Sequence, residues 1–579
     1  MANLPDYVAM AKPNPLSNRA PWWTNTAQTL AGVMLWVGFW NAIPMSGGGA
    51  AAGLLSCGLG TAIIALILAA LLCHLLFYLI PGKLGMQTGH PLYIVGTSTY
   101  GVNGGFLMPG FLMGVLQFGW LAVNSWWAGI LLTAPIKGCA ATADQVVANY
   151  PAMFFGISIT WAVVAAFVGL KGIKYVAKIA TFFPLIPLTV LLVMFAKTAG
   201  GLGDFDASKI GTAAVAEPAA VEAPAETAPI ASEATADEAA PAEAVAAEAV
   251  PAEPAAEAVA AEAVPAEPAA EAVAAEAAPV EPAAEAVAAE AAPVEPAAEA
   301  VAAETAPEAT SEAAAVEAPA APAVPLTTLA IFNLMGAYVL GFFATAGAAG
   351  CDMGTASRDA KDVRWGGLVG VFAATVFSGT MALAIYAGAY GSGIIGYDAP
   401  VKETTSLMNA IMGDQMGNVF NFLLAVAAFP AACFSSMIAA NSFKTTLPKV
   451  NPFISCGLGT LAAVILILTQ VAGDCAAVFG TIGASFGPIC GAIAADYFLS
   501  GCKWNGPRAG FNPAGWISWF FGFFVGAYPF FQGLCPALPQ VAMPCPPLLA
   551  FVVGFVLYFV LASVGLQSKT LEMEAVVED

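Results

Sequence analysis

Residues 36–49 read WVGFWNAIPMSGGG, and residues 342–354 read FFATAGAAGCDMG. Each stretch lies in a long apolar segment that would otherwise form a continuous helix. In the first, Pro44 removes a backbone hydrogen-bond donor, and the glycines behind it weaken the helix further. The second is equally rich in small residues and carries Asp352. Exposed peptide groups are costly in lipid, so helices broken at this depth survive only beside protein or a water-filled cavity.

The two stretches belong to a set of twelve apolar segments. A membrane-spanning helix needs about 20 mostly apolar residues, and each of the twelve meets this requirement. They are residues 29–55, 58–80, 106–134, 152–170, 175–198, 327–351, 366–391, 418–440, 453–472, 476–500, 514–531 and 548–566.

The broken segments are the first and the sixth of the twelve spans. Interrupted helices at matching positions of two halves are typical of transporters whose substrate site lies between inverted repeats. The pattern therefore predicts an all-α polytopic membrane protein with repeats at 29–200 and 327–500, five helices each, and two further helices in 501–566. The alternative is that the glycines only allow close helix packing.

The composition agrees with a membrane protein. Hydrophobic residues make up 59% and charged residues 10% of the 579 residues, against about 25% charged in soluble proteins, which excludes an ordinary soluble enzyme. The net charge of −21 comes from residues 210–325, which hold 23 acidic residues and no Lys or Arg. The rest holds 16 acidic and 18 basic residues. The membrane body is therefore nearly neutral, and the overall charge does not indicate what it binds.

The basic residues predict the orientation. With a cytoplasmic N-terminus, fourteen Lys and Arg fall in inside loops and four in outside loops, as the positive-inside rule requires. We therefore expect residues 1–28 and 567–579 to be cytoplasmic and residues 201–326 to be external, in the inner (plasma) membrane. No removable signal peptide is expected, because the first apolar run has the length of a spanning helix and no small-residue cleavage site follows it.

The acidic insert, residues 201–326, is a low-complexity repeat. The sequence EPAAEAVAAE starts at Glu253, Glu267, Glu281 and Glu295, a period of 14 residues. It has no aromatic residue and recurrent Pro, so we expect a disordered, extended tether. A docking arm for a cationic partner and a tolerated repeat expansion are both compatible with this composition.

Cysteine and histidine usage argues against a metal site and against an enzyme. The eleven Cys show no CxxC spacing, and His74 and His90 are the only histidines. The membrane body also lacks a nucleophile–base pair and a phosphate-binding loop, so we expect no enzyme activity, no metal and no cofactor. Cys535 and Cys545 share one predicted external loop, where they either pair or remain free thiols.

The third span combines an amide with an indole. Gln117 and Trp120 are three residues apart and so share a helix face. An indole can stack on a flat heterocycle, and an amide can both donate to and accept from its polar edge. An interfacial Trp and a helix-packing Gln explain the pair equally well.

Two acidic residues fall within predicted spans, where ionisable groups are candidates for function. Asp352 follows the break in the sixth span, where a helix N-terminus can stabilise an anion. It is predicted to carry a proton or to hold the broken backbone in shape. Asp496 lies near the cytoplasmic end of the tenth span, where capping or gating is expected rather than substrate contact.

Four stretches carry a resemblance to a known family. They are VMLWVGFWNAIPMSGGG (33–49), VLQFGWLAV (115–123), FATAGAAGCDMGTASRDAK (343–361) and GPICGAIAADYFLSG (487–501). Residues 25–200 and 327–566 resemble the nucleobase:cation symporter family 1, most closely the bacterial cytosine permeases. The resemblance implies a twelve-helix fold of the leucine-transporter type that works by alternating access.

The family's binding residues carry over position by position. The base would stack between Trp120 and Phe343, Gln117 would bind its edge, and Thr345 matches a polar position on helix six. Trp40 matches an aromatic that lines the pocket. The predicted substrate-binding residues are Trp40, Asn41, Gln117, Trp120, Phe343 and Thr345.

The chain departs from the sodium-coupled members in the eighth span. Where they supply an Asn and two hydroxyls to the ion, this chain has Ala428, Ala431 and Ala432. Sodium needs several oxygen ligands, and the main-chain carbonyls of Trp36 and Phe39 alone would make a poor site. We therefore favour a proton as the coupling ion, with a site rebuilt around Ser435 and Ser436 as the alternative.

A second departure concerns the family's Asp-x-x-Arg pair, which here reads Asp352 to Thr355. The sequence thus predicts a secondary transporter that imports a nucleobase, cytosine or a related pyrimidine or purine, with a coupling cation and the lipid bilayer as further partners and no nucleic acid. The alternatives are a transporter of another small heterocycle (a hydantoin, allantoin or a vitamin precursor) and a non-transporting receptor or scaffold that displays the acidic arm.

Overall fold

The computed structural model describes residues 4–25, 53–138, 143–171, 183, 185–210, 326–348, 350–397, 404–447 and 449–573. These residues fall within one compact unit formed by Met1–Glu217 and Ala320–Asp579. In the described ranges every element is helical, and β pairing is limited to two isolated bridges, Ala20 with Ser357 and Arg508 with Thr570. The predicted all-α class is confirmed.

Nine helical segments in the described residues are long and apolar enough to cross a membrane. Several run on through a π-helical or 3-10 turn. They are Leu59–Thr88 (α4 Leu59–Leu72, η3 Cys73–Tyr78, α5 Leu79–Thr88), Val102–Lys137 (α8 Val102–Gly105, η4 Phe106–Phe111, α9 Leu112–Lys137), Pro151–Leu170 (α11), Leu185–Asp204 (α13 Leu185–Thr198, η5 Ala199–Asp204), Thr328–Thr345 (within α14, Thr328–Ala348), Ala360–Gly391 (α16 Ala360–Gly367, η8 Leu368–Ala373, α17 Ala374–Gly391), Asp414–Phe443 (within α19, Asp414–Thr446), Ala477–Leu499 (within α21, Cys475–Leu499) and Pro546–Ser563 (α24).

Two further predicted spans have weaker helical counterparts. α22 (Pro513–Gly526) and α23 (Tyr528–Leu534) form one apolar pair bent by 61°, and α20 (Pro452–Leu468) is apolar but shorter. Residues 29–52 of the first predicted span lie outside the described residues, so the total of twelve stays a prediction. The predicted acidic insert lies outside them from residue 211 to 325.

The short helices are α1 (Asp6–Ala9), η1 (Leu16–Asn18), α2 (Trp22–Asn25), α6 (Leu92–Val95), α7 (Thr97–Tyr100), α10 (Ala143–Asn149), η6 (Ala207–Lys209), α15 (Gly350–Gly354), α18 (Thr404–Met412) and η9 (Val471–Gly473).

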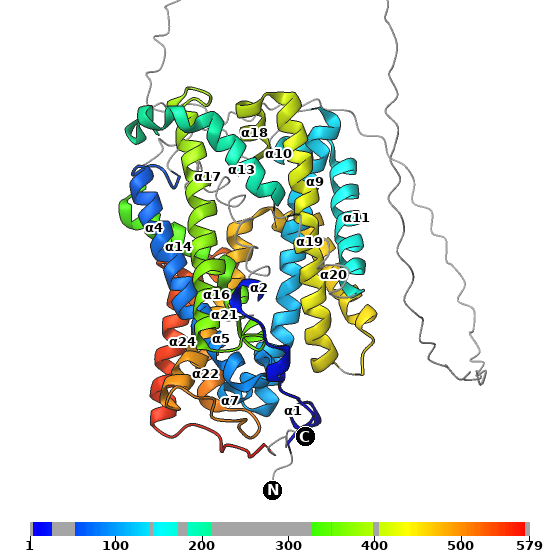
Figure 1. The fold of residues 1–579 in the computed structure, drawn as a ribbon, viewed down its shortest axis with the longest axis vertical. Coiled ribbons are helices and arrows are strands. Elements are labelled where there is room, and N and C mark those ends of the chain that lie inside the picture. Colours follow the sequence, from blue (N-terminus) through cyan, green and yellow to red (C-terminus); the bar gives the residue numbers. More distant parts are fainter. Residues whose placement is uncertain are drawn as a thin grey trace, which may run out of the picture. The chain divides into compact units, whose positions relative to one another are not determined.

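The spans pack in two groups, each around its own apolar core (Figure 1). α9, α11, α19 and α20 pack on one another and share the smaller core. The larger core is formed mainly by α4 with η3 and α5, α14, α17, α21 and α24. Helices at equivalent positions of the two predicted repeats are neighbours, because α4 packs on α17 and α9 packs on α19. This pairing is expected when two five-helix repeats interlock.

Small residues allow α5 and α15 to approach closely. A Cβ atom on Gly85 would lie 1.9 Å from the carbonyl oxygen of Cys351, and one on Gly354 would lie 2.1 Å from that of Gly82. The segment after the sixth-span break is therefore packed backbone to backbone against the second span. Close helix packing, the alternative explanation of the glycines, accounts for this part of the sequence.

Replacing Gly85 with alanine is expected to destabilise the protein by about 1–3 kcal/mol, because the added methyl group collides with backbone that has no space to move. Gly60 of the same span is a matched control, since a Cβ there meets no atom within 4 Å. Gly60→Ala should leave the melting temperature in detergent unchanged or higher, because alanine favours helix. Equal melting temperatures for both variants would contradict the close packing.

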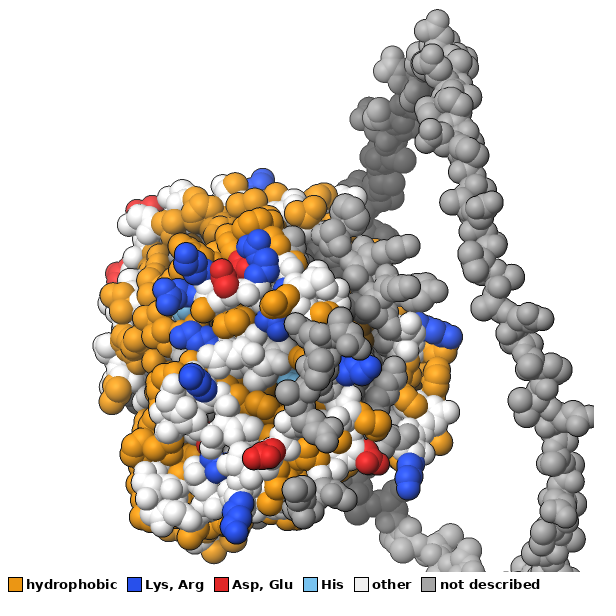
Figure 2. All heavy atoms as spheres, turned by 60° about the horizontal axis from the view of Figure 1, so that its bottom comes forward, with side chains coloured by type: hydrophobic (Ala, Val, Ile, Leu, Met, Phe, Trp, Pro, Cys, Tyr) orange, Lys and Arg blue, Asp and Glu red, His pale blue; other side chains and the backbone are white. Residues whose placement is uncertain are grey.

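The described segments near both termini meet at one end of the bundle. Val8 is buried with Ile94 and Val102, and Leu571 and Met573 pack on them. Figure 2 shows this end, where Lys and Arg side chains gather. The segments that meet there carry basic residues that the sequence assigns to the cytoplasm, and the exposed lysines among them include Lys12, Lys503 and Lys569. Which side of the membrane this end faces stays a prediction.

Candidate functional site

Trp120 lies in a cluster of aromatic rings from three helices. Its ring centroid is 4.9 Å from that of Phe342 on α14 and 4.9 Å from that of Phe479 on α21. Phe342 and Phe479 are 5.6 Å apart and perpendicular. We call these three residues the aromatic cluster. It joins α9 of the four-helix group to α14 and α21 of the other group, so it lies where the two groups meet.

The indole of Trp120 also makes a polar contact with the sixth span. Its Nε1 donates to the Thr345 hydroxyl at 3.2 Å, and Thr345 is buried. Two residues that the sequence analysis selected from different spans are therefore brought together. Since neither carries a charge, the site is apolar with a few uncharged polar atoms.

Gln117 lies one turn before Trp120 on α9, and Phe343 follows Phe342 on α14. Gln117 is buried, and its amide donates only a long contact, 3.6 Å, to the Met113 sulfur of its own helix. The ring that contacts Trp120 is Phe342, and Phe343 contacts Phe342 in turn, at 5.1 Å. The predicted placement of a base between Trp120 and Phe343 stays a prediction, and in this conformation the direct ring contact of Trp120 on α14 is with Phe342, edge to face. Phe342 and Phe479 were not selected from the sequence.

Asn124 connects three helices of the four-helix group one turn beyond Trp120. Its amide donates to the Ala428 carbonyl at 3.1 Å, and its oxygen accepts from the Trp161 indole at 3.2 Å. Ala428 is one of the three alanines that the sequence prediction places where an ion ligand would be needed. Here its main-chain oxygen accepts a hydrogen bond from an amide.

The two candidate serines of the eighth span lie on α19. Ser435 donates at 3.4 Å to the Ala431 carbonyl of its own helix. Ser436 is fully buried, and its hydroxyl has no partner among the described residues. It packs against Gly169, whose Cβ would lie 3.0 Å from that of Ser436. The first-span candidates Trp36, Phe39, Trp40 and Asn41 lie outside the described residues.

Asp352 holds a loop in place. It follows the start of α15, and its carboxylate accepts a hydrogen bond at 2.9 Å from the backbone N–H of Leu92, the first residue of α6. Of the two predicted roles for Asp352, the contact fits the one that fixes the backbone around the break.

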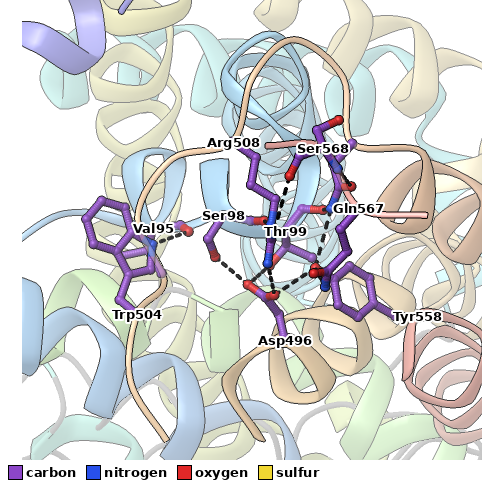
Figure 3. A network of polar contacts seen from close by, with 10 residues as sticks. Val95, Ser98, Thr99, Asp496, Trp504, Arg508, Tyr558, Gln567 and Ser568 are labelled. Atoms are coloured by element: carbon purple, nitrogen blue, oxygen red, sulfur yellow. Dashed lines mark hydrogen bonds and ion pairs between the residues drawn. The ribbon is translucent and has the colours of Figure 1, made fainter. Parts of the chain in front are cut away.

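Asp496 is the centre of a buried polar network (Figure 3). Its carboxylate accepts from the Ser98 hydroxyl at 2.6 Å and the Tyr558 hydroxyl at 2.7 Å, and Nη2 of Arg508 lies 3.2 Å away. Arg508 in turn donates to the carbonyls of Ser98 and Ser568 at 2.7 and 3.2 Å. The network joins α21, α24 and the segment between α6 and α8.

The network is distant from the aromatic cluster. Asp496 is 17 residues from Phe479 on α21, about 25 Å at 1.5 Å per residue. This distance fits a role in fixing the helix ends rather than in substrate contact.

The described residues contain no group of three or more His, Cys, Asp or Glu that could hold a metal ion. Cys535 and Cys545 are both free thiols, the former exposed and the latter buried. No protein-family model matches the sequence, and no curated protein matches it.

Solved structures do share the fold. One is Mhp1, a nucleobase-cation-symport-1 family transporter, in a closed conformation with bromovinylhydantoin bound, with a TM-score of 0.52 and 12% identity, covering 96% of this chain and 94% of that chain. Another is an inward-facing conformation of Mhp1, with a TM-score of 0.53 and 14% identity, covering 98% and 94%. The chain is therefore a multi-pass membrane protein of the leucine-transporter fold, as the sequence predicted. The closer likeness to cytosine permeases stays a prediction.

Proposed function

We propose that this chain is a secondary transporter that carries a nucleobase, cytosine or a related pyrimidine or purine, by cation-coupled alternating access. The observation that carries the proposal is the uncharged aromatic cluster between the two helix groups of a transporter fold. A neutral, flat ring with polar edges suits such a site, because aromatic faces stack on it and no buried charge is left unpaired.

The ring would bind on the face of Trp120. Phe479 is tilted by 32° over the indole at 4.9 Å, so a base could stack there only if Phe479 moves aside. Gln117 would then bind the edge of the base, since its amide makes one long contact, with Met113, among the described residues. Thr345 and an aromatic of the sixth span, Phe343 or its neighbour Phe342, would complete the pocket with Trp40 and Asn41 of the first span.

We favour a proton as the coupling ion over sodium. Ala428, Ala431 and Ala432 offer no side-chain oxygen to a hard cation. The Ala428 carbonyl already accepts from Asn124, and the Ser435 hydroxyl donates within its own helix. A sodium site would have to combine Ser436 with main-chain carbonyls of Trp36 and Phe39.

Whole-cell uptake of radiolabelled cytosine tests the proposal, with unlabelled pyrimidines, purines and hydantoins as competitors. We expect one nucleobase class to remove most of the labelled uptake. Uptake should rise when the medium is acidified and should not change when sodium is replaced by choline at fixed pH. Steep sodium dependence would contradict proton coupling, and the absence of uptake for every ring would contradict the transport function.

A hydantoin is the second candidate substrate. The observation in its favour is that one of the two solved structures of similar fold holds bromovinylhydantoin. Hydantoins and pyrimidines are both flat rings with alternating donors and acceptors, so the same cluster could stack either one. Stronger competition by hydantoin than by any base would favour this candidate.

A further inference from the structure

His74 is a buried polar residue that the proposed binding site does not use. Its side chain is 3% exposed, and Nδ1 has no hydrogen-bond partner among the described residues. Within the span Leu59–Thr88, fifteen residues precede it and fourteen follow. It also lies within the apolar run predicted to span the membrane, residues 58–80, where an ionisable side chain is costly and is a candidate for function.

The backbone around His74 is irregular. η3, Cys73–Tyr78, is a π-helical segment inside the second span, and it packs against a second π-helical segment, η8, inside the seventh. The second and seventh spans are equivalent helices in the two predicted repeats, although the turn comes later in the second span than in the seventh. Single π-turns inside α-helices are uncommon and occur frequently at functional sites. The contact between the second and seventh spans therefore joins two π-helical turns, which makes it a candidate functional site.

Glycines make the space in which the imidazole lies. A Cβ atom on Gly367 of α16 would be 2.6 Å from Nδ1 of His74 and 2.4 Å from the ring of Tyr78. The His74 ring is stacked near that of Tyr78, with centroids 6.1 Å apart and planes at 26°. A Cβ on Gly350, the first residue of α15, would lie 2.7 Å from the Tyr78 ring. His74 is thus linked through Tyr78 to the helix that follows the sixth-span break.

The charges around His74 determine how it can titrate. Among the described residues, Arg364 of α16 is the charged group that interacts electrostatically with His74. Three carboxylates nearby have other partners, because Asp362 binds Arg358, Asp496 binds Arg508 and Asp352 binds the Leu92 N–H. The other titratable side chains on the elements packed around η3 are Tyr78 and Lys83 of this span, Tyr338, Cys351, Lys361, Cys73, Cys475, Cys490 and Tyr497.

A protonated imidazole needs an acceptor for each N–H. Nδ1 of His74 lies against Gly367 and has no acceptor among the described residues. The positive charge of Arg364 would repel a protonated imidazole. In this packed arrangement the ring is neutral. If α16 and η3 move apart, water reaches Nδ1 of His74 and can supply a proton to it. When the two segments pack together again, the packed arrangement favours loss of that proton.

We propose that His74 binds the coupling proton during transport. The lone pair of Nδ1 accepts one proton from a hydronium ion when the contact with α16 opens to water on one side of the membrane, the imidazolium gives that proton to a water molecule that reaches it from the other side, and the contact then closes on the neutral ring. No bond to the substrate forms or breaks. The proposal rests on the proposed transport function and adds the residue through which proton movement is coupled to it.

The test uses the full-length protein in liposomes and the variant His74→Gln, which keeps a polar side chain of similar size but cannot carry a proton. Two assays with radiolabelled cytosine are compared, exchange without any ion gradient and accumulation driven by an inward proton gradient. At one proton per base, a gradient of one pH unit supports accumulation of up to about tenfold. We expect H74Q to retain exchange and to lose accumulation, with the internal concentration rising no higher than the external one.

His90→Gln is the matched control. His90 is also buried with an unpartnered Nδ1, but it lies between spans, beside Trp504, and its loss should leave both assays unchanged. Accumulation by H74Q equal to that of the unaltered protein would overturn the proposal. Loss of exchange together with accumulation would also overturn it, because His74 would then support the fold or the substrate site. If the unaltered protein itself fails to exchange cytosine, the proposed function fails, and the two failures are thereby distinguished.

Discussion

Replacing Trp120 with alanine is expected to reduce uptake of radiolabelled base to background while the protein still reaches the membrane. The change removes a ring that contacts Phe342 and Phe479 and a donor to Thr345. An aromatic pair contributes about 0.5–1.5 kcal/mol beyond its buried area, and burial of the area about 1.5–3 kcal/mol. Together they correspond to a loss of affinity of about 30- to 2,000-fold.

Two further variants separate binding from helix packing. Trp120→Phe keeps a ring for stacking and loses only the N–H, so it should retain part of the uptake. Trp127→Phe changes the same helix, where the indole donates to the Cys475 sulfur of α21 at 3.1 Å, and should leave uptake unchanged. Normal uptake by W120A would contradict the site assignment. Equal losses of uptake in W120A and W127F would show that the Trp120 indole supports packing between α9 and α21 rather than stacking on the substrate.

The fold could be predicted because its main determinants are local. The length of an apolar run decides whether a helix can cross the bilayer, and Pro44 or a run of glycines decides where a helix is interrupted. Such features are read within about twenty residues of sequence. Their spacing then predicts the two repeats, and the observed pairs α4–α17 and α9–α19 fit that arrangement.

The partners within the site were harder to predict, because they depend on helix rotation. Consecutive residues of a helix point about 100° apart, so a sequence match does not show which of two adjacent rings contacts a third. In this conformation Phe342 contacts Trp120, and the role of its neighbour Phe343 beside a base stays a prediction. Phe479 had no local signal at all, since nothing in the tenth span distinguishes it from an ordinary membrane-facing phenylalanine.

The irregular turns and the long-range polar contacts also could not be predicted from the sequence. The π-helical turns η3 and η8 contain ordinary apolar residues, and packing between the spans explains them better than composition does. The Asp496 carboxylate was recognised as unusual, but its donor Ser98 is 398 residues away in the chain. A buried acid predicts that partners exist without indicating which ones.

Replacing Asp496 with asparagine is expected to lower the free energy of unfolding by about 3–5 kcal/mol, because Arg508 would remain buried without its counter-ion. Both side chains are about 5% exposed, and the ion pair lies among four further polar contacts. Melting temperature and folded yield in detergent measure the effect. Arg358→Lys is the control, because it keeps a cation beside Asp362 on a side chain that is 49% exposed. It should cost at most about 1 kcal/mol.

A double variant shows how the network stabilises the protein. Removing both charges, as in Asp496→Leu with Arg508→Met, avoids an unpaired buried ion, and apolar replacement of a buried pair is often nearly neutral. We therefore expect it to be more stable than D496N. The recovery should be partial, because the carbonyls of Ser98 and Ser568 lose the donor that Arg508 supplies. A double variant no more stable than D496N would mean that these carbonyl contacts, and not the ion pair, hold the segment between α6 and α8 against α24.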